Sequence, residues 1–265
     1  MIVDSVDVLA LARDAAAVGA DMLASARPAT VRLKGDRDYV TDLDLEIERT
    51  VREYLAAATP DFSFLGEESA GHDVGGEYRW VLDPIDGTSN FVHGIPLCAV
   101  SLALLRGDTT VVAAIVAPFL GQAFHASRGG GSYANDEQIF ASGVRQISSA
   151  MVSIGDYAVG PDAPGKNVER LKVTAALAGQ AERVRMLGAA SLDLAWLAQG
   201  RTDGCVILAN KPWDTAAGVL LAREAGAVIN DALGDPHSLS AATTVGSASI
   251  ELAQSMVDLL IASWT

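Results

Sequence analysis

The chain has 265 residues, half of them hydrophobic, and carries 33 acidic against 19 basic residues for a net charge of −14 at pH 7. This composition excludes a disordered chain, and the length suits one large domain or two small ones around a buried core. The negative field disfavours nucleic acid as a partner, because such binding depends on Lys and Arg that neutralise phosphates. If the substrate is itself an anion, a divalent cation is the usual means of screening the site.

Neither a leader, a membrane span nor a disulfide framework is expected. The first ten residues contain two aspartates and no basic run, unlike a signal peptide. The longest apolar stretches, residues 97–105 and 111–120, are far shorter than the roughly 20 residues that a membrane span needs. Cys98 and Cys205 lie in apolar runs, where buried free thiols are the expected state. We therefore expect a soluble cytoplasmic protein with no membrane partner.

The first half of the chain predicts helices packed on an antiparallel sheet. Apolar residues at helical spacing predict an amphipathic helix over 3–25, and a second helix over 42–58 has Thr41 or Asp42 as its N-cap. Short apolar runs predict strands, and the glycine-rich turn at 129–131 predicts a hairpin. The predicted strands span residues 62–65, 79–82, 99–105, 110–116 and 122–126.

The second half alternates strands with helices, which predicts an α/β unit. Its predicted strands span residues 151–154, 183–186, 204–208 and 227–229, and its predicted helices span 167–178, 190–198, 215–225 and 247–262. The change of pattern falls between residues 140 and 150. We therefore expect two domains, residues 1–145 with most of the chemistry and residues 146–265 with the remainder of the site.

The strongest local signal is an apolar strand that leads into Asp83-Pro84-Ile85-Asp86-Gly87-Thr88. Two carboxylates aimed at one point repel each other unless a cation or a proton lies between them. The segment Gly87–Ser89 would open a short helix, whose free backbone N–H groups form an anion site. A cation site would then adjoin a phosphate site, as metal-assisted phosphoryl chemistry requires. The alternative is an ordinary loop in which Asp83 is a cap and Asp86 begins a turn.

Three further acidic segments are weak signals when each is taken alone. A predicted strand leads into Glu67 and Glu68, and adjacent glutamates usually lie in a solvated turn. The segment 34–44 reads as a loop that enters the second helix, where capping by Thr41 and Asp42 is the ordinary explanation. Asp214 begins a helix of small residues and is by itself an ordinary N-cap. None of these acids is accompanied by cysteine or by paired histidines, which disfavours a thiol phosphatase or a zinc site.

Taken together and in this order, the motifs resemble the inositol monophosphatase family of lithium-sensitive, magnesium-dependent sugar phosphatases. The matching pieces are Val40-Thr41-x-x-Asp44, Gly66-Glu67-Glu68, Asp83-Pro84-Ile85-Asp86-Gly87-Thr88 and Trp213-Asp214-x-Ala216-Ala217-Gly218. The resemblance implies an α/β fold with α+β character in the first half, arranged as a layered αβαβα sandwich. It also implies inhibition by Li⁺ and a homodimer.

The resemblance further implies a site for two or three Mg²⁺ ions, two of them bridged by Asp83. The implied metal ligands are Glu67, Asp83, the backbone carbonyl of Ile85, Asp86 and Asp214. A donor set made only of oxygen suits this hard cation. Water activated by the metal would attack phosphorus in line, without a phosphoenzyme.

The resemblance assigns the catalytic role to Glu67 and to a hydrogen-bonded pair, Asp44 and Thr88, which would orient and deprotonate the attacking water. The residues implied to bind substrate are Asp86, Gly87, Thr88, Ser89, Gly188, Ala189 and Ala190. The last three would lie beside the leaving group, although a strand-to-helix turn also explains Gly188.

The substrate is harder to predict from the sequence than the metal site. Inositol-specific relatives have an acidic residue about six positions before the Trp-Asp pair, whereas this chain has Ile207 near that place. Asn210 and Lys211 are candidates to replace its polar contacts, and His93 is a candidate to touch substrate. The predicted function is hydrolysis of inositol monophosphate or a related small sugar or polyol phosphate.

Two kinds of alternative stay open. The first is a relative that acts on fructose 1,6-bisphosphate, histidinol phosphate or 3′-phosphoadenosine 5′-phosphate. The second is a catalytically weak regulatory protein that keeps the fold and binds a macromolecular partner. The complete set of acids and the negative charge argue against an RNA-binding role for such a regulator.

Overall fold

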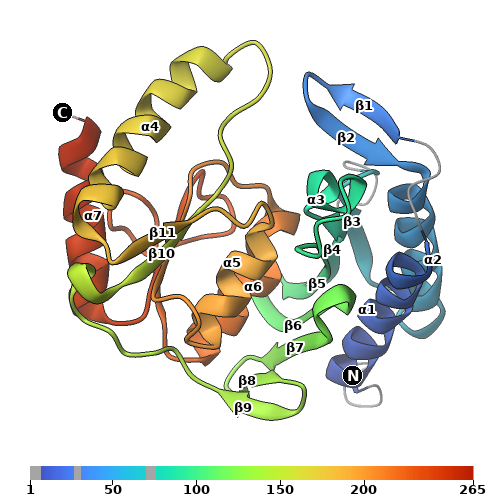
Figure 1. Cartoon of the computed structure of the whole chain (residues 1–265). Helices are drawn as coiled ribbons and strands as arrows, with labels where there is room; N and C mark the ends of the chain where they lie inside the picture. Colours follow the sequence, from blue (N-terminus) through green and yellow to red (C-terminus); the bar gives the residue numbers. More distant parts are fainter. Residues whose placement is uncertain (1–6, 27–30, 70–75, 265) are drawn as a thin grey trace.

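The computed structural model describes residues 7–26, 31–69 and 76–264, and its elements form five layers (Figure 1). A helix pair, a seven-stranded sheet, a second helix pair, a five-stranded sheet and a third helix pair follow one another across the molecule. The helix pairs are α1 (Val8–Ser25) with α2 (Asp42–Ala58), α5 (Ala190–Ala198) with α6 (Pro212–Glu224), and α4 (Ala163–Gln180) with α7 (Ile250–Trp264). The predicted α/β class and αβαβα sandwich are confirmed.

The seven-stranded sheet has the strand order β3-β4-β5-β6-β7-β8-β9. Its strands are β3 (Ser63–Gly66), β4 (Tyr78–Asp86), β5 (Ala99–Arg106), β6 (Thr109–Ala117), β7 (Gln122–Ser127), β8 (Gly131–Ala134) and β9 (Glu137–Ile139). Every neighbouring pair is antiparallel except β3 with β4, which run parallel. Helices cover both faces, so β5 is buried at every position except Arg106 and its sequence reads as an unbroken apolar run.

The five-stranded sheet has the order β11-β10-β12-β14-β13. Its strands are β10 (Met151–Ile154), β11 (Arg183–Arg185), β12 (Gly204–Ile207), β13 (Val228–Asn230) and β14 (Thr244–Ser247). The first three in spatial order run parallel, and β14 is antiparallel to both of its neighbours. The sequence prediction missed β14 and began a helix at Ser247, whereas α7 begins at Ile250. A four-residue strand flanked by turn residues has no period of its own, and pairing on both sides makes it a strand.

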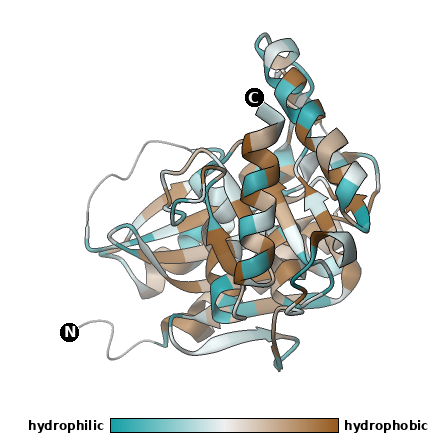
Figure 2. Ribbon diagram, turned by 90° about the vertical axis from the view of Figure 1, so that its left-hand side faces the viewer, coloured by the Kyte–Doolittle hydropathy of each residue, from teal (hydrophilic) through white to brown (hydrophobic). Residues whose placement is uncertain are grey.

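Two hydrophobic cores hold the layers together. One lies between α1, α2 and the first sheet, and the other joins the two sheets through α5 and α6. Figure 2 shows apolar colour concentrated on the strands and on one side of the outer helices, whose other side is polar. Cys98 and Cys205 are buried free thiols, as predicted. None of the helices in the described ranges is long and apolar enough to cross a bilayer.

The structure corrects the prediction at two places that bear on the site. Residues 34–44 are not a loop, because β1 (Val31–Gly35) and β2 (Asp38–Thr41) form an antiparallel hairpin that stands at the edge of the molecule (Figure 1). The strand β4 does not end at Asp83 but continues to Asp86, with an irregularity in its pairing to β5 between these two residues. Proline cannot donate to a ladder, so this bulge accommodates Pro84.

The remaining elements are short. Helix α3 (Thr88–Val92) follows β4, and two 3₁₀ turns span Pro118–Leu120 and Ile147–Ser149. The proposed boundary near residue 145 falls between β9 and β10, but α6 from the second half packs on β5 and β6 of the first. The division into residues 1–145 and 146–265 stays a prediction.

Candidate active site

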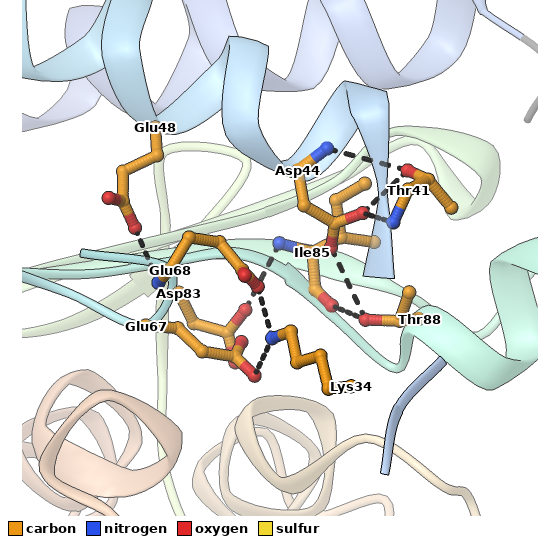
Figure 3. A network of polar contacts seen from close by, with 9 residues as sticks. All are labelled: Lys34, Thr41, Asp44, Glu48, Glu67, Glu68, Asp83, Ile85 and Thr88. Carbon is orange, nitrogen blue, oxygen red and sulfur yellow. Dashed lines mark hydrogen bonds and ion pairs between the residues drawn. The ribbon is translucent and has the colours of Figure 1, made fainter. Parts of the chain in front are cut away.

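Four of the predicted carboxylates come together at one edge of the first sheet. Because β3 and β4 are parallel, their carboxyl ends lie side by side, and Glu67 N–H donates to the Leu82 carbonyl at 3.2 Å. This places Glu67 beside Asp83, as Figure 3 shows. Asp86 ends β4, and Asp214 lies in the first turn of α6.

The electrostatics of these four groups show that they share one region. Burial, followed by the charges of Glu67, Asp86 and Asp214, raises the pKa of Asp83 well above its usual range. Burial also raises the pKa of Asp86 to about 6 and that of Asp214 to about 7. The acids therefore destabilise one another when all are ionised.

This donor set fits a hard divalent cation. Its donors are carboxylate oxygens that repel one another, and a cation among them would relieve the repulsion. Within the described part of the chain, however, no three His, Cys, Asp or Glu side chains already have the arrangement of a metal site. The fit therefore rests on the chemistry of the oxygen donors and on the raised pKa values of Asp83, Asp86 and Asp214.

Lys34, from the β1–β2 hairpin, brings a positive charge to this edge. Its Nζ donates to Glu67 Oε1 at 3.0 Å and also to Glu68 (Figure 3). Burial lowers the pKa of Lys34, but the hydrogen bond to Glu68 and the charge of Glu67 outweigh it and raise the pKa above its usual value. The sequence analysis included Lys34 in a loop and assigned it no role, because its partners are 33 and 34 residues away.

Packing explains why glycine precedes the two glutamates in Gly66-Glu67-Glu68. Glu68 N–H donates to Glu48 Oε2 at 2.8 Å, and a Cβ at Gly66 would lie 2.1 Å from the same oxygen. A side chain at this position would displace the Glu48 carboxylate from its bond to Glu68. Burial raises the pKa of Glu68 to about 7.

Asp44 and Thr88 lie near each other, as expected. Thr41 is the N-cap of α2, and its N–H and hydroxyl donate to Asp44 Oδ2 at 2.8 and 2.5 Å. The Thr88 hydroxyl is 3.4 Å from Asp44 Oδ1 and 2.9 Å from the Ile85 carbonyl (Figure 3). The hydroxyl is thus placed between the buried Asp44 and a carbonyl that was predicted to be a metal ligand. Burial raises the pKa of Asp44.

The turn into α3 requires glycine. Gly87 has φ +85°, and a Cβ there would lie 2.7 Å from the Leu97 carbonyl oxygen. Helix α3 begins directly after it at Thr88, as predicted. The first backbone N–H groups of the helix, including that of Ser89, have no partner within the helix.

Asp86 is held by the second half of the chain, which the sequence analysis did not foresee. Ser191 N–H and its hydroxyl donate to Asp86 Oδ2 at 2.7 and 2.5 Å, and Ala190 N–H donates to Oδ1 at 3.2 Å. Gly188 lines the pocket described below, whereas Ala189 is buried. The predicted roles of Gly188, Ala189 and Ala190 beside the leaving group stay predictions.

A pocket of about 740 Å³ opens in front of the Gly87–Ser89 turn. Besides the turn itself, its polar and aromatic lining comes from the hairpin, the end of α3, the loop after β10 and α4, namely Arg37, Tyr39, His93, Asp156, Tyr157 and Asn167. His93 lies edge-on to Tyr39, with ring centroids 6.3 Å apart, and its contact with substrate stays a prediction.

Asp156 is the carboxylate of this lining, and no sequence motif indicated it. The Arg170 guanidinium donates to the Asp156 carbonyl at 2.5 Å, and Asn167 binds both backbone groups of Ala158, so the loop is fixed in place. Burial raises the pKa of Asp156.

The residues proposed from the Ile207 region do not reach the pocket. Ile207 is buried in β12. The Asn210 side chain donates to Ala241 O and Thr244 Oγ1 at 3.1 and 2.7 Å, and neither Asn210 nor Lys211 belongs to the lining. The charge of Lys211 does act on Asp214, and the roles of these two residues toward substrate stay predictions.

Comparison with known proteins gives one family. Residues 4–263 match the profile of the Inositol monophosphatase family. The chain is 40% identical over 218 residues to an inositol-1-monophosphatase of Rhizobium meliloti, covering 81% of this chain and 80% of the relative. It is 36% identical over 213 residues to the Nus factor SuhB of Pseudomonas aeruginosa, covering 79% and 78%. The solved structure of a Thermotoga maritima IMPase superposes with a TM-score of 0.86 at 29% identity, covering 98% of both chains.

Proposed function

Because the chain belongs to the inositol monophosphatase family, we propose that it is a metal-dependent phosphatase that hydrolyses inositol monophosphate or a related small sugar or polyol phosphate. One observation supports this most strongly. Glu67, Asp83, Asp86 and Asp214 crowd together beside the glycine turn that opens α3, and the pKa values of the three aspartates are raised. Such a cluster is unfavourable unless a cation or a bound proton lies among the carboxylates, and a cation there would also attract an anionic substrate.

We propose Mg²⁺ as the metal, with two or three ions per site. The residues that would hold it are Glu67, Asp83, the carbonyl of Ile85, Asp86 and Asp214. When bound, Mg²⁺ would neutralise charge on the phosphate and lower the pKa of the attacking water. The part of the chain is to keep these oxygens converging, and the three donors from α5 do so for Asp86.

Proton transfer is proposed to involve Glu67 and the Asp44–Thr88 pair. With the Thr88 hydroxyl donating to Asp44, its oxygen is free to accept a hydrogen bond from water, and a proton taken from that water would pass through the hydroxyl to the Asp44 carboxylate. Glu67 lies on the side of Asp83 away from Thr88, and it contacts Lys34 (Figure 3). An attacking water would therefore lie within reach of two acceptors.

Phosphate oxygens would bind to the N–H groups of Gly87, Thr88 and Ser89, with the leaving group in the 740 Å³ pocket. The pocket has a carboxylate at Asp156 and a guanidinium at Arg37. Such a lining suits a leaving group with hydroxyls, which both donate and accept hydrogen bonds. The homodimer, the cytoplasmic location and the inhibition by Li⁺ stay predictions.

The proposal is tested by phosphate release from a panel of esters with Mg²⁺. Inositol 1-phosphate should give the highest kcat/KM, compared with fructose 1,6-bisphosphate, histidinol phosphate and 3′-phosphoadenosine 5′-phosphate. A higher kcat/KM for one of these would reassign the substrate within the family. Absence of release from every ester by folded protein, at any Mg²⁺ concentration, would favour the regulatory alternative.

A further inference from the structure

A second cavity, of about 380 Å³, lies along α6, where its lining runs from Ala216 to Glu224. The rest of the lining comes from the start of β6, the turn after β7 and the loop after β13. It shares no residue with the pocket in front of Gly87. Arg223 lies nine residues after Asp214, which along a helix is about 13.5 Å. The two cavities are therefore separate.

Two arginines line this cavity without a carboxylate partner. Neither Arg128 nor Arg223 takes part in any ion pair found in the described ranges of the chain. The Arg223 guanidinium donates to the His237 carbonyl at 2.7 Å. Burial lowers the pKa of Arg223, and no neighbouring negative charge offsets this effect. A guanidinium in this position lacks the anion that it would normally pair with.

Among the residues that the structure describes, neither acid of the lining forms an ion pair with Arg128 or Arg223, and the histidine of the lining is neutral. Glu224 accepts from Gly129 N–H and Gly131 N–H at 2.8 and 3.0 Å, so both of its oxygens are engaged by the β7–β8 turn. Burial lowers the pKa of His237 to about 4, which keeps its ring neutral at pH 7. Asp108 at the mouth of the cavity is the only other acid of the lining. The lining thus holds two guanidinium groups and two carboxylates, of which Glu224 is bound through both oxygens to the turn and pairs with neither arginine in the described ranges.

We propose that this cavity binds a small anion through its phosphate group, at a site distinct from the catalytic one. Guanidinium groups match phosphate oxygens in geometry and charge, and the hydroxyls of Thr109, Thr110 and Ser238 supply further donors around them. The volume is that of a site for a small phosphorylated metabolite. This proposal does not depend on the catalytic function.

Inorganic phosphate is the probe, titrated calorimetrically into the full chain in EDTA at constant ionic strength. EDTA keeps divalent metal from recruiting phosphate to the acid cluster. Arg223→Gln should weaken phosphate binding by at least about tenfold, since it removes a charged hydrogen-bonding partner. Arg106→Gln is the matched control, because Arg106 is exposed, pairs with Glu77 and lies outside the cavity. It should leave the affinity unchanged.

Asp108→Asn supplies a second measurement that does not rely on a loss. Removing this carboxylate should tighten phosphate binding several-fold, because it lowers the repulsion at the mouth. Acetate should bind at least about tenfold more weakly than phosphate. Equal phosphate affinity in wild type, Arg223→Gln and Asp108→Asn would overturn the proposal. Absence of phosphate binding to the wild type, or acetate binding as tight as phosphate, would overturn it as well.

Discussion

The active site has two walls that are built in different ways. The acidic wall comes from the ends of two strands and the first turn of a helix, and it consists of Glu67, Asp83, Asp86 and Asp214. Close packing leaves this wall little freedom: side chains are excluded at Gly66 by Glu48 and at Gly87 by the Leu97 carbonyl. The geometry of the acids is therefore set by the backbone.

The leaving-group wall comes from the loop after β10, from α4 and from the end of β11. It consists of Asp156, Tyr157, Leu171 and Met186. Asp156, Leu171 and Met186 are exposed. The Arg170 guanidinium fixes the backbone at Asp156 by donating to its carbonyl. Substitution here changes what the pocket contacts without moving the acids. The comparison suggests that the chemistry is fixed by the first wall and that the choice of substrate is set by the second.

The largest effect is expected from a change in the acidic wall. Asp86→Asn removes a ligand charge and should lower kcat on inositol 1-phosphate with Mg²⁺ by at least about a hundredfold. Circular dichroism should show an intact fold, because asparagine has nearly the same shape. Asp42→Asn is the control, since Asp42 is an exposed acid that pairs with Arg32 at 2.9 Å. Turnover near the wild-type value in Asp86→Asn would count decisively against the acidic wall as the metal site.

The acidic wall should also make stability depend on pH and on Mg²⁺. Unfolded aspartates titrate near pH 3.9, whereas Asp86 and Asp214 titrate at about 6 and 7 in the folded chain. Between about pH 4 and pH 7 the folded state therefore binds more protons, so stability without Mg²⁺ should fall as the pH rises. Mg²⁺ should restore about 2.7 kcal/mol at a hundredfold excess over Kd.

Melting temperatures in EDTA and in Mg²⁺, at about pH 5 and about pH 7.5, measure this effect. Asp214→Asn should flatten the pH dependence in EDTA relative to the wild type. Groups outside the wall, such as His237, contribute equally to both proteins and cancel in this difference. A melting temperature that ignores Mg²⁺ at the higher pH would contradict the prediction.

A smaller effect is expected where the second half of the chain supports the acidic wall. Ser191→Ala removes the hydroxyl that donates to Asp86 at 2.5 Å but keeps the backbone N–H contacts. Mg²⁺ affinity, measured by calorimetry, should fall by about tenfold, and saturating Mg²⁺ should restore most of the turnover. Ser247→Ala is the matched control, because Ser247 is also buried and donates to Met256 Sδ. Equal Mg²⁺ affinity in the two variants would remove Ser191 from the supporting role.

The two walls also differ in how far they can be predicted from sequence. The acidic wall could be predicted because its residues follow short motifs at strand and helix ends, such as Asp83-Pro84-Ile85-Asp86. Helices and strands with a clear pattern of apolar residues could be predicted equally well, and β10 and α5 have the predicted bounds.

The parts that escaped prediction depend on contacts between distant segments. Asp86 and Ser191 are 105 residues apart, and Lys34 is 33 residues from Glu67. The strand β14 exists because β12 and β13 pair with it, which no local pattern indicates. Asp156 lies after β10 in a stretch without a motif, and only the fold brings it to the pocket.

The smallest effect, and the one that sharpens the comparison most, is expected in the leaving-group wall. Asp156→Asn keeps the shape of the side chain but replaces one acceptor oxygen with a donor. The KM for inositol 1-phosphate should rise about three- to tenfold with little change in kcat, since one hydrogen bond to a charged group contributes about 1.5 kcal/mol or less at an exposed position.

A phosphate ester without hydroxyls on its leaving group, such as p-nitrophenyl phosphate, separates this role from a general one. Its KM should be unchanged in Asp156→Asn, because no hydroxyl is present to bind the carboxylate. Asp162→Asn provides the control, since Asp162 precedes α4 outside the pocket lining. A parallel rise of KM for both esters would mean that Asp156 acts through the field at the phosphate and not through the leaving group. The two walls would then share one electrostatic role, and the division between chemistry and substrate choice would fail.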